Sequence, residues 1–141
     1  MQAPDYFDTT EEQRKVDPAY TGSRAQALAD GAIIDVSDLG RQVGFKWPVA
    51  LTKATFEDAV LWTEEDSEKQ VPQNQKSRLF SVVGACADYV RSRGPQADRM
   101  RFRINRIPRD GESRGAKQRL LQVVAHPGDD GEPVLTIRIP A

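Results

Sequence analysis

Cysteine and histidine are scarce in this sequence of 141 residues, which holds one of each, Cys86 and His126. A single cysteine cannot form an intramolecular disulfide, and the two residues together are too few for the usual Cys/His zinc sites. The sequence also lacks a Walker loop, a dinucleotide-binding glycine motif and a Gly-x-Ser-x-Gly elbow. We therefore expect no bound metal, no cofactor and no catalytic residues.

Long apolar runs are absent too, and none approaches the roughly 20 residues that a membrane helix needs. The N-terminus, MQAPDYFDTTEEQRK, lacks the charged-then-apolar order of a signal peptide. The sequence therefore predicts a cytoplasmic protein that makes no contact with a membrane. Basic and acidic side chains nearly balance, at 20 against 21, which argues against both a uniformly basic nucleic-acid binder and a strongly acidic DNA mimic.

Residues 1–20 contain few apolar positions and have an acidic bias, which is typical of a mobile tail. Residues 21–141 have the length of one domain, and we find no internal repeat and no second apolar core in them. The sequence thus predicts a mobile N-terminal tail over residues 1–20 and a single α+β domain over residues 21–141.

Two apolar periods define the C-terminal half. Apolar residues recur every three and four positions over residues 77–93, which predicts a long helix with one buried face. From Met100 the period changes to two, the spacing of a half-buried strand. We expect a three-stranded antiparallel meander packed on the long helix, with strands over residues 99–107, 119–125 and 134–139.

The N-terminal half predicts shorter elements. Ser23 is a candidate helix cap, and residues 33–36 read as a strand before another helical turn that starts at Ser37. Pro48 confines any strand over residues 45–51 to a sheet edge, and Thr55 with Asp58 resembles a capping box that opens a helix. The acidic residues that follow are expected to be solvated, and the polar connector over residues 108–117 is expected to be mobile.

Charge is distributed unevenly along the chain. Residues 1–75 carry fourteen acidic and seven basic side chains, whereas residues 76–120 carry twelve basic and four acidic ones. Such asymmetry marks either a partner-binding surface or two halves that neutralise each other within one fold. The candidate acidic partner-binding residues are Glu57, Asp58, Glu64, Glu65, Asp66 and Glu68.

Strand alternation decides where the basic residues point. If the apolar residues of the strand from Met100 face the core, Arg101 and Arg103 face outward, and the same parity turns Arg138 outward on the last strand. Arginine forks suit both carboxylates and phosphates. Phe102 is used inward, so this face lacks the stacking aromatics of RNA-binding sheets. This basic face is either a plain solvated surface, a protein-binding surface or a nucleic-acid-binding surface. The candidate basic partner-binding residues are Arg101, Arg103, Arg109, Arg114, Lys117, Arg119 and Arg138.

Two further features each have two interpretations. Phe45, Trp47 and Pro48 form either an apolar patch for a partner or the closing edge of a small core. His126 precedes Asp129, Asp130 and Glu132, which resembles a base or metal cluster. Because these acids fall among glycines and prolines, a turn held by backbone hydrogen bonds is the favoured interpretation.

Several strings resemble an uncharacterised family of small proteins encoded on plasmids, integrative elements and phages. They include Gly-Phe-Lys-Trp-Pro-Val from Gly44 and Gly-Asp-Asp-Gly-Glu-Pro from Gly128, and the resemblance covers roughly residues 28–139. It implies a setting among the accessory genes of mobile DNA, often beside anti-restriction and other anti-defence functions. It implies no activity and no catalytic residue.

The leading hypothesis is a non-enzymatic binding protein of a mobile genetic element that inhibits a host defence complex, of the anti-CRISPR or anti-restriction type. Its partner would be a host protein or nucleoprotein complex. One alternative is a DNA- or RNA-binding accessory factor that uses the arginine-bearing sheet face and loop. The other is an enzyme with an unrecognised carboxylate site. The sequence leaves the oligomeric state open.

Overall fold

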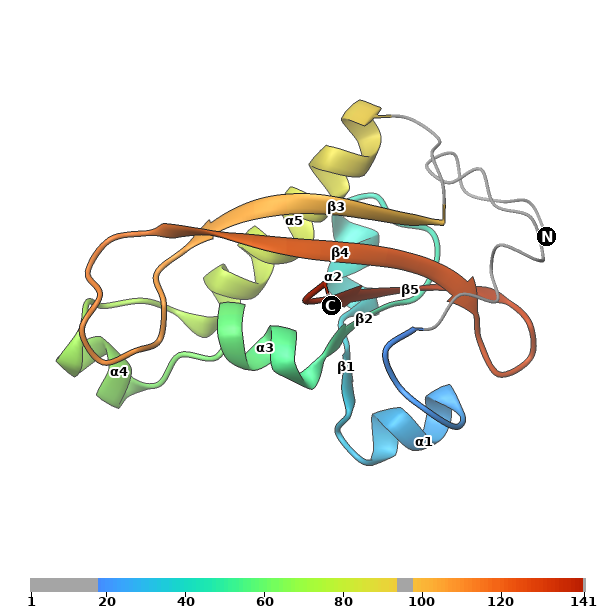
Figure 1. Cartoon of the computed structure of the whole chain (residues 1–141), viewed down its shortest axis with the longest axis horizontal. Coiled ribbons are helices and arrows are strands. Elements are labelled where there is room, and N and C mark those ends of the chain that lie inside the picture. Colours follow the sequence, from blue (N-terminus) through green and yellow to red (C-terminus); the bar gives the residue numbers. More distant parts are fainter. Residues whose placement is uncertain (1–17, 94–97, 141) are drawn as a thin grey trace.

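Five strands form one mixed sheet in the order β1-β2-β5-β4-β3, and a long helix lies across one of its faces (Figure 1). The structure is a computed structural model that describes residues 18–93 and 98–140. The helices are α1 (Arg24–Ala29), α2 (Ser37–Gln42), α3 (Lys53–Ala59), α4 (Glu64–Lys69) and α5 (Gln75–Arg93). The strands are β1 (Ile33–Asp35), β2 (Val49–Thr52), β3 (Arg99–Arg106), β4 (Lys117–Pro127) and β5 (Pro133–Arg138).

The predicted α+β class is confirmed, and the C-terminal strands form the expected meander. β3 pairs with β4 and β4 pairs with β5, both antiparallel. The period of two appears in the burial of β3, where Met100, Phe102 and Ile104 are buried and the residues between them are exposed. β4 and β5 are buried on both faces for most of their length.

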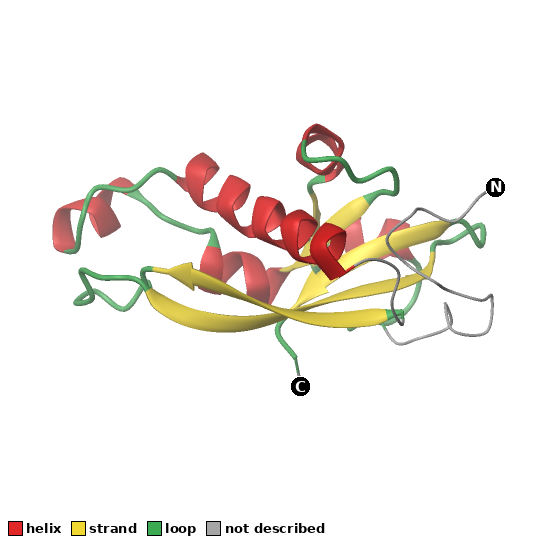
Figure 2. Cartoon of the chain, turned by 90° about the horizontal axis from the view of Figure 1, so that it is seen from above, coloured by secondary structure: helices red, strands yellow, loops and turns green. Residues whose placement is uncertain are grey.

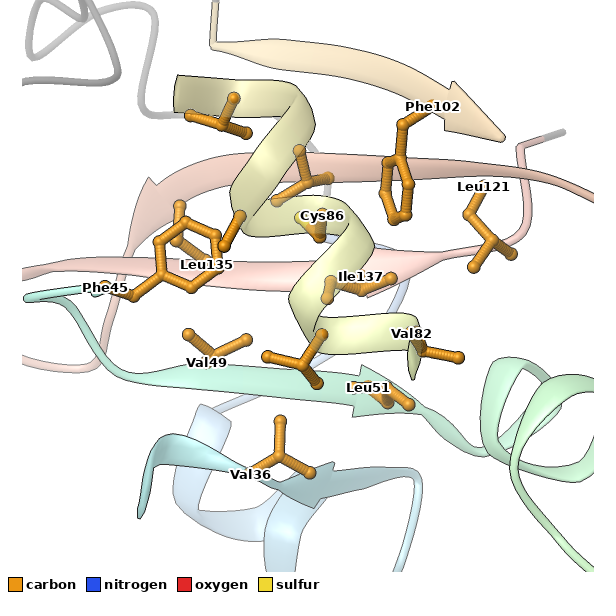
Figure 3. Close-up of a cluster of buried hydrophobic side chains, with 14 of the residues drawn as sticks. Val36, Phe45, Val49, Leu51, Val82, Cys86, Phe102, Leu121, Leu135 and Ile137 are labelled. Carbon is orange, nitrogen blue, oxygen red and sulfur yellow. The ribbon is translucent and has the colours of Figure 1, made fainter. Parts of the chain in front are cut away.

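Helix α5 supplies the other half of the main core. Its buried apolar residues, Val82, Val83, Cys86, Ala87 and Val90, recur at helical spacing and face the sheet. Figure 2 shows α5 lying along the sheet. In Figure 3 the side chains of Phe102, Leu121 and Ile137 lie around this helix. Burial of this stripe, at roughly 25 cal/mol per Å² of apolar surface, is what holds the helix to the sheet.

The prediction of an edge strand near Pro48 is wrong. β2 lies inside the sheet, antiparallel to β1 on one side and parallel to β5 on the other. Pro48 precedes the first strand residue, so no ladder bond requires its missing N–H group. Its carbonyl still accepts a hydrogen bond from the N–H of Leu135 at 2.8 Å. A proline placed just before a strand therefore leaves both edges of that strand available.

The predicted capping box at Thr55 and Asp58 is also wrong. The cap of helix α3 lies three residues earlier, at Thr52, whose side chain accepts from the N–H of Thr55. A full capping box joins Thr63 and Asp66 at the start of α4. The acidic segment predicted to be solvated is thus a short helix, and Asp66 within it is buried.

Of the predicted N-terminal tail, residues 1–17 lie outside the described residues. Tyr20, in the described part, packs on a small second apolar cluster of Ala27, Ile33 and Ala50. Among the described helices, none is both long and apolar enough to cross a membrane.

Candidate functional site: an arginine-bearing sheet face

The two faces of the sheet are covered differently. Helix α5 packs on one face, and α2 and α3 contact α5. On the other face, α1 packs over Ile33 of β1 and Ala50 of β2. The exposed side chains of β3 lie on that second face and belong to Arg99, Arg101, Arg103 and Asn105.

Cross-strand register adds Arg138 to the same face. Gln122 of β4 is paired with Arg101 of β3 on one side and with Arg138 of β5 on the other. Directly paired residues of antiparallel strands project to the same face, so these three side chains form one row across three strands. The Nε of Arg138 donates to the Oε1 of Gln122 at 2.9 Å. We call Arg99, Arg101, Arg103 and Arg138 the arginine face.

Three guanidinium groups of the arginine face carry uncompensated charge. Arg99, Arg101 and Arg103 are exposed, and no carboxylate within the described parts of the chain forms an ion pair with them. Exposed arginines at alternate positions of one strand lie on one face and raise the local positive potential. Their planar donor forks remain available to an external carboxylate or phosphate.

The other predicted basic residues lie elsewhere, and several meet the predicted acidic ones. The Nε of Arg109 lies 2.6 Å from the Oδ2 of Asp66, and the Nε of Arg119 lies 3.5 Å from the Oδ2 of Asp58. Arg106, which sequence reasoning did not single out, binds the same Asp58 carboxylate through Nε and Nη2 at 3.1 and 3.2 Å. The two halves of the chain therefore partly neutralise each other.

The remaining predicted residues divide between exposed and paired groups. Arg114 donates from Nη1 to the carbonyl of Gln70 at 3.0 Å, while Lys117 is exposed. Glu65 pairs with Lys69 at 2.8 Å. Glu57, Glu64 and Glu68 are exposed. The acidic surface thus survives only at the glutamates of α3 and α4.

Gln70 is a structural centre that sequence reasoning missed. It is 3 % exposed, and its Nε2 donates to the carbonyls of Pro108 and Ser113 at 2.8 and 2.7 Å. Its Oε1 accepts from the N–H of Gly111 at 3.0 Å. These bonds fasten the connector between β3 and β4, predicted to be mobile, to the end of α4. In Figures 1 and 2 the two segments lie together at one end of the molecule.

We call this end of the molecule, formed by α4 and the connector over residues 107–116, the lobe. Two carboxyl groups within it are held in the ionised form. The hydrogen bond from Arg109, together with that from the N–H of Thr63, lowers the pKa of Asp66. Hydrogen bonds from the hydroxyl and N–H of Ser113 and the N–H of Glu112 lower the pKa of Asp110 to about 2. Donors aimed at a carboxylate favour its charged form.

A pocket of about 320 Å³ lies beside the outer edge of β3. Val82 and Ala85 of α5 and Ile104 of β3 contribute apolar surface to it, and Arg78 and Arg103 contribute charge. Arg78 is 6 % exposed. Its guanidinium lies 4.5 Å from the centre of the Trp62 ring and donates to the carbonyls of Val60 and Ile107 at 3.1 and 3.0 Å.

The proposed apolar patch is in the core. Phe45 and Trp47 are 3 % and 2 % exposed, and both belong to the main cluster of buried side chains. Pro48 is half-buried. This burial matches the second interpretation of these residues, the closing edge of a core, and leaves no aromatic surface here for a partner.

A family model described as a family of unknown function, DUF6573, matches residues 6–141. The chain belongs to this family. The match begins upstream of residue 28, where the sequence resemblance starts. No curated protein and no solved structure matches the chain.

In this DUF6573 chain, the buried side chain of His126 contacts the neighbouring strand β5. Its ring is 1 % exposed, and its Nε2 lies 2.7 Å from the hydroxyl of Thr136. The carboxylate of Asp129 instead accepts from the N–H groups of Arg24 and Ala25 at 2.6 and 2.9 Å. Asp129 thus binds backbone donors at the start of α1, far away in the sequence, while within the turn the N–H of Asp130 donates to the Oε2 of Glu132 at 3.1 Å.

The remaining reactive and metal-ligating side chains in the described part of the DUF6573 chain are either buried or far apart. Cys86 is completely buried, and burial raises the pKa of its thiol. Across residues 18–93 and 98–140, no three histidine, cysteine or acidic side chains lie close enough together to hold a metal ion.

Proposed function

We propose that this chain is a non-enzymatic binding protein that docks on an acidic surface of a partner protein through the arginine face. One observation carries the proposal. Arg99, Arg101 and Arg103 stand exposed on one strand, and no carboxylate of residues 18–93 or 98–140 pairs with them, whereas Arg106, Arg109 and Arg119 each have such a partner. Carboxylates of the chain thus pair with arginines at the end of β3, in the connector and on β4. The three exposed guanidinium groups of β3 are left for an external anion.

The preference for a protein partner rests on what accompanies the arginines. Phe102 points into the core at 2 % exposure, so no aromatic ring of β3 is available to stack on a base. Gln122 and Asn105 add neutral amide groups on the same side of the sheet. Arginine forks matched with carboxylates give directional, charge-assisted hydrogen bonds that do not require stacking.

The exposed glutamates of α3 and α4 form a second, oppositely charged surface. Glu57, Glu64 and Glu68 are exposed and lie on α3 and α4, not on the strands of the arginine face. We propose that this acidic surface competes for a basic nucleic-acid channel of the partner while the arginine face holds the partner's carboxylates. Complementary charge on two surfaces increases the rate and specificity of association more than its final affinity.

The family resemblance supplies the proposed setting. A small binding protein from the accessory genes of mobile DNA would act in the cytoplasm of the host on a defence complex, of the anti-CRISPR or anti-restriction type. This setting rests on association with such genes, and the arginine face does not depend on it.

The test compares two double variants of the full chain as baits in a host lysate. R101Q/R103Q removes two unpaired charges from the arginine face, and R41Q/K76Q removes two exposed charges from α2 and α5. We expect the wild type and R41Q/K76Q to retain the same stoichiometric protein partner, and R101Q/R103Q to lose it. Equal recovery by all three proteins, or recovery of no partner from hosts that carry such defence systems, would contradict the proposal.

Nucleic acid is the second candidate partner. It is favoured by the regular spacing of Arg99, Arg101 and Arg103, which are alternate residues on one face of β3. Contact with about three phosphates predicts that binding weakens with salt at a log–log slope of about −2 to −3. Titration of labelled duplex and single-stranded DNA at 50 and 200 mM salt measures this slope. Absence of binding at the lower concentration removes this candidate.

A further inference from the structure

The outer edge of β3 has unused backbone hydrogen-bonding groups. β3 is the last strand of the sheet, and no described strand pairs with its far side. The N–H of Ala125 donates to the carbonyl of Asp98 at 2.7 Å, so Asp98 and Ala125 form a pair of the hydrogen-bonded type. This bond fixes the phase of the whole ladder.

The register then assigns each residue of β3 to one side. It runs without a break from Arg99 opposite Val124 to Arg106 opposite Lys117. Hydrogen-bonded and non-hydrogen-bonded pairs alternate, so the backbone groups of Arg99, Arg101 and Arg103 point away from β4. The residues that carry the unpaired guanidinium groups are therefore also the ones that present free N–H and C=O groups at the edge.

A second copy of this chain is a poor occupant of that edge. Antiparallel pairing of two β3 strands in a register that places Arg101 opposite Arg101 or Arg103 sets like charges directly against each other. Like charges opposite each other destabilise a strand pair, and charged edge residues are a recognised means of preventing edge-to-edge aggregation. The same charges would stabilise an incoming strand that carries carboxylates.

The other side of an incoming strand would meet helix α5. Side chains of a strand alternate between its faces, so those not facing the arginines would turn toward α5 and the 320 Å³ pocket beside the β3 edge. Val82, Ala85 and Ile104 give this pocket an apolar surface. The edge therefore suits a segment in which acidic residues alternate with small apolar ones.

We propose that the edge of β3 binds an extended segment of the partner protein as an additional strand. Its carboxylates lie opposite Arg99, Arg101 and Arg103, and its alternate apolar side chains enter the pocket toward α5. This inference rests on the proposed function and specifies its binding mode: main-chain hydrogen bonds provide affinity, and the alternation of charge and apolar groups provides specificity.

The experiment uses three blocked peptides with the full-length protein. The first peptide alternates Glu and Val. The second has the same composition, with its glutamates in adjacent pairs. The third is the alternating peptide, N-methylated at the residues whose backbone N–H groups would point toward β3. Calorimetry measures affinity, and amide hydrogen exchange followed by NMR measures protection. We expect the alternating peptide to bind at least about tenfold more tightly than either control, and to protect the N–H groups of Arg101 and Arg103.

Equal affinity of the three peptides, unchanged amide exchange at Arg101 and Arg103, or no saturable binding at millimolar peptide would each overturn the strand-addition mode. R103P provides an independent check, because its missing N–H points to the open edge and not to β4. It should abolish binding of the alternating peptide, whereas R103Q should only weaken it.

The two proposals fail in different ways. If R101Q/R103Q loses the lysate partner while N-methylation of the peptide has no effect, the arginine face stands and strand addition is wrong. If R101Q/R103Q keeps the partner, the proposed function itself is wrong.

Discussion

The side-chain oxygen of Gln70 accepts a hydrogen bond from the backbone N–H of Gly111 at 3.0 Å, across 41 positions of the chain. The amide nitrogen of the same side chain donates to two further carbonyls of that connector. One buried amide therefore ties the end of α4 to three points of the connector, beside the ion pair of Arg109 with Asp66.

Replacing Gln70 by alanine should destabilise the protein. The substitution removes hydrogen bonds to the N–H of Gly111 and to the carbonyls of Pro108 and Ser113, and each such bond contributes about 0.5–1.5 kcal/mol. Urea unfolding should show a loss of that size, with faster amide exchange at Gly111. Q118A, at an exposed glutamine of β4, is the matched control and should change little. Equal losses in both variants would refute the assigned role.

Leu120 and Leu121 are neighbours on β4 that lie on opposite faces of the sheet. Leu121 is 0 % exposed in the core, while Leu120 is half-buried beside Arg103. L121A should therefore reduce the free energy of unfolding by about 2–5 kcal/mol, the usual cost of a buried leucine. L120A should cost clearly less, because its site opens to solvent. A reversed order would show that the register of β4 is shifted by one residue.

The elements that could be predicted are those whose signal is local. The apolar stripe around Cys86 and the alternation around Phe102 each lie within one element, and both the long helix and the meander were predictable from them. The outward direction of Arg101 and Arg103 followed from the same alternation. The secondary structure and direction of these residues could be predicted without knowing what the rest of the chain does.

The errors arose where distant residues decide the structure. The position of β2 depends on pairing with β5, more than eighty residues later in the sequence, and Pro48 by itself suggested an edge. Thr52 and Thr55 are both suitable residue types for a helix cap. Thr52 caps α3 because β2 ends at that residue, and the end of β2 could not be located from the local sequence. The contact between Asp66 and Arg109 spans 43 positions, so the charge pattern alone could not separate paired from unpaired arginines.

Acid should weaken the lobe through Asp110. Its pKa lies near 2 in the folded protein against an ordinary value of 3.8, so its ionised form stabilises the fold above pH 3.8, and this contribution is lost as the pH falls toward 2. D110N should be less stable than the wild type at pH 7, and the difference should shrink between pH 4 and about 2.

Urea midpoints measured across that pH range test the effect. E112Q, which removes a charge from an exposed neighbour, serves as the control and should follow the wild type. A constant gap between D110N and the wild type down to pH 2 would mean that the hydrogen bonds from Ser113 do not depend on the charge of Asp110.

Arginines of the arginine face and of the core should differ in their effect on stability. Arg101 is exposed and unpaired, so R101Q should change the free energy of unfolding by no more than about 0.5 kcal/mol. Arg78 is buried on Trp62 and donates to two backbone carbonyls, so R78Q should cost about 2 kcal/mol or more. Thermal and urea unfolding of both variants check this. A large loss in R101Q would assign Arg101 to the fold instead of to a partner.

The central place of β5 has a consequence for how the sheet assembles. β1 and β2 form one pair and β3 and β4 another, and β5 is the strand that joins them. A chain interrupted before Pro133 would lose the backbone hydrogen bonds that connect the two pairs, which would then be joined through α5 and the shared core. Removal of residues 133–140 should therefore lower the free energy of unfolding strongly, whereas cleavage within the Gly128–Glu132 connector, which leaves β5 in place, should cost less.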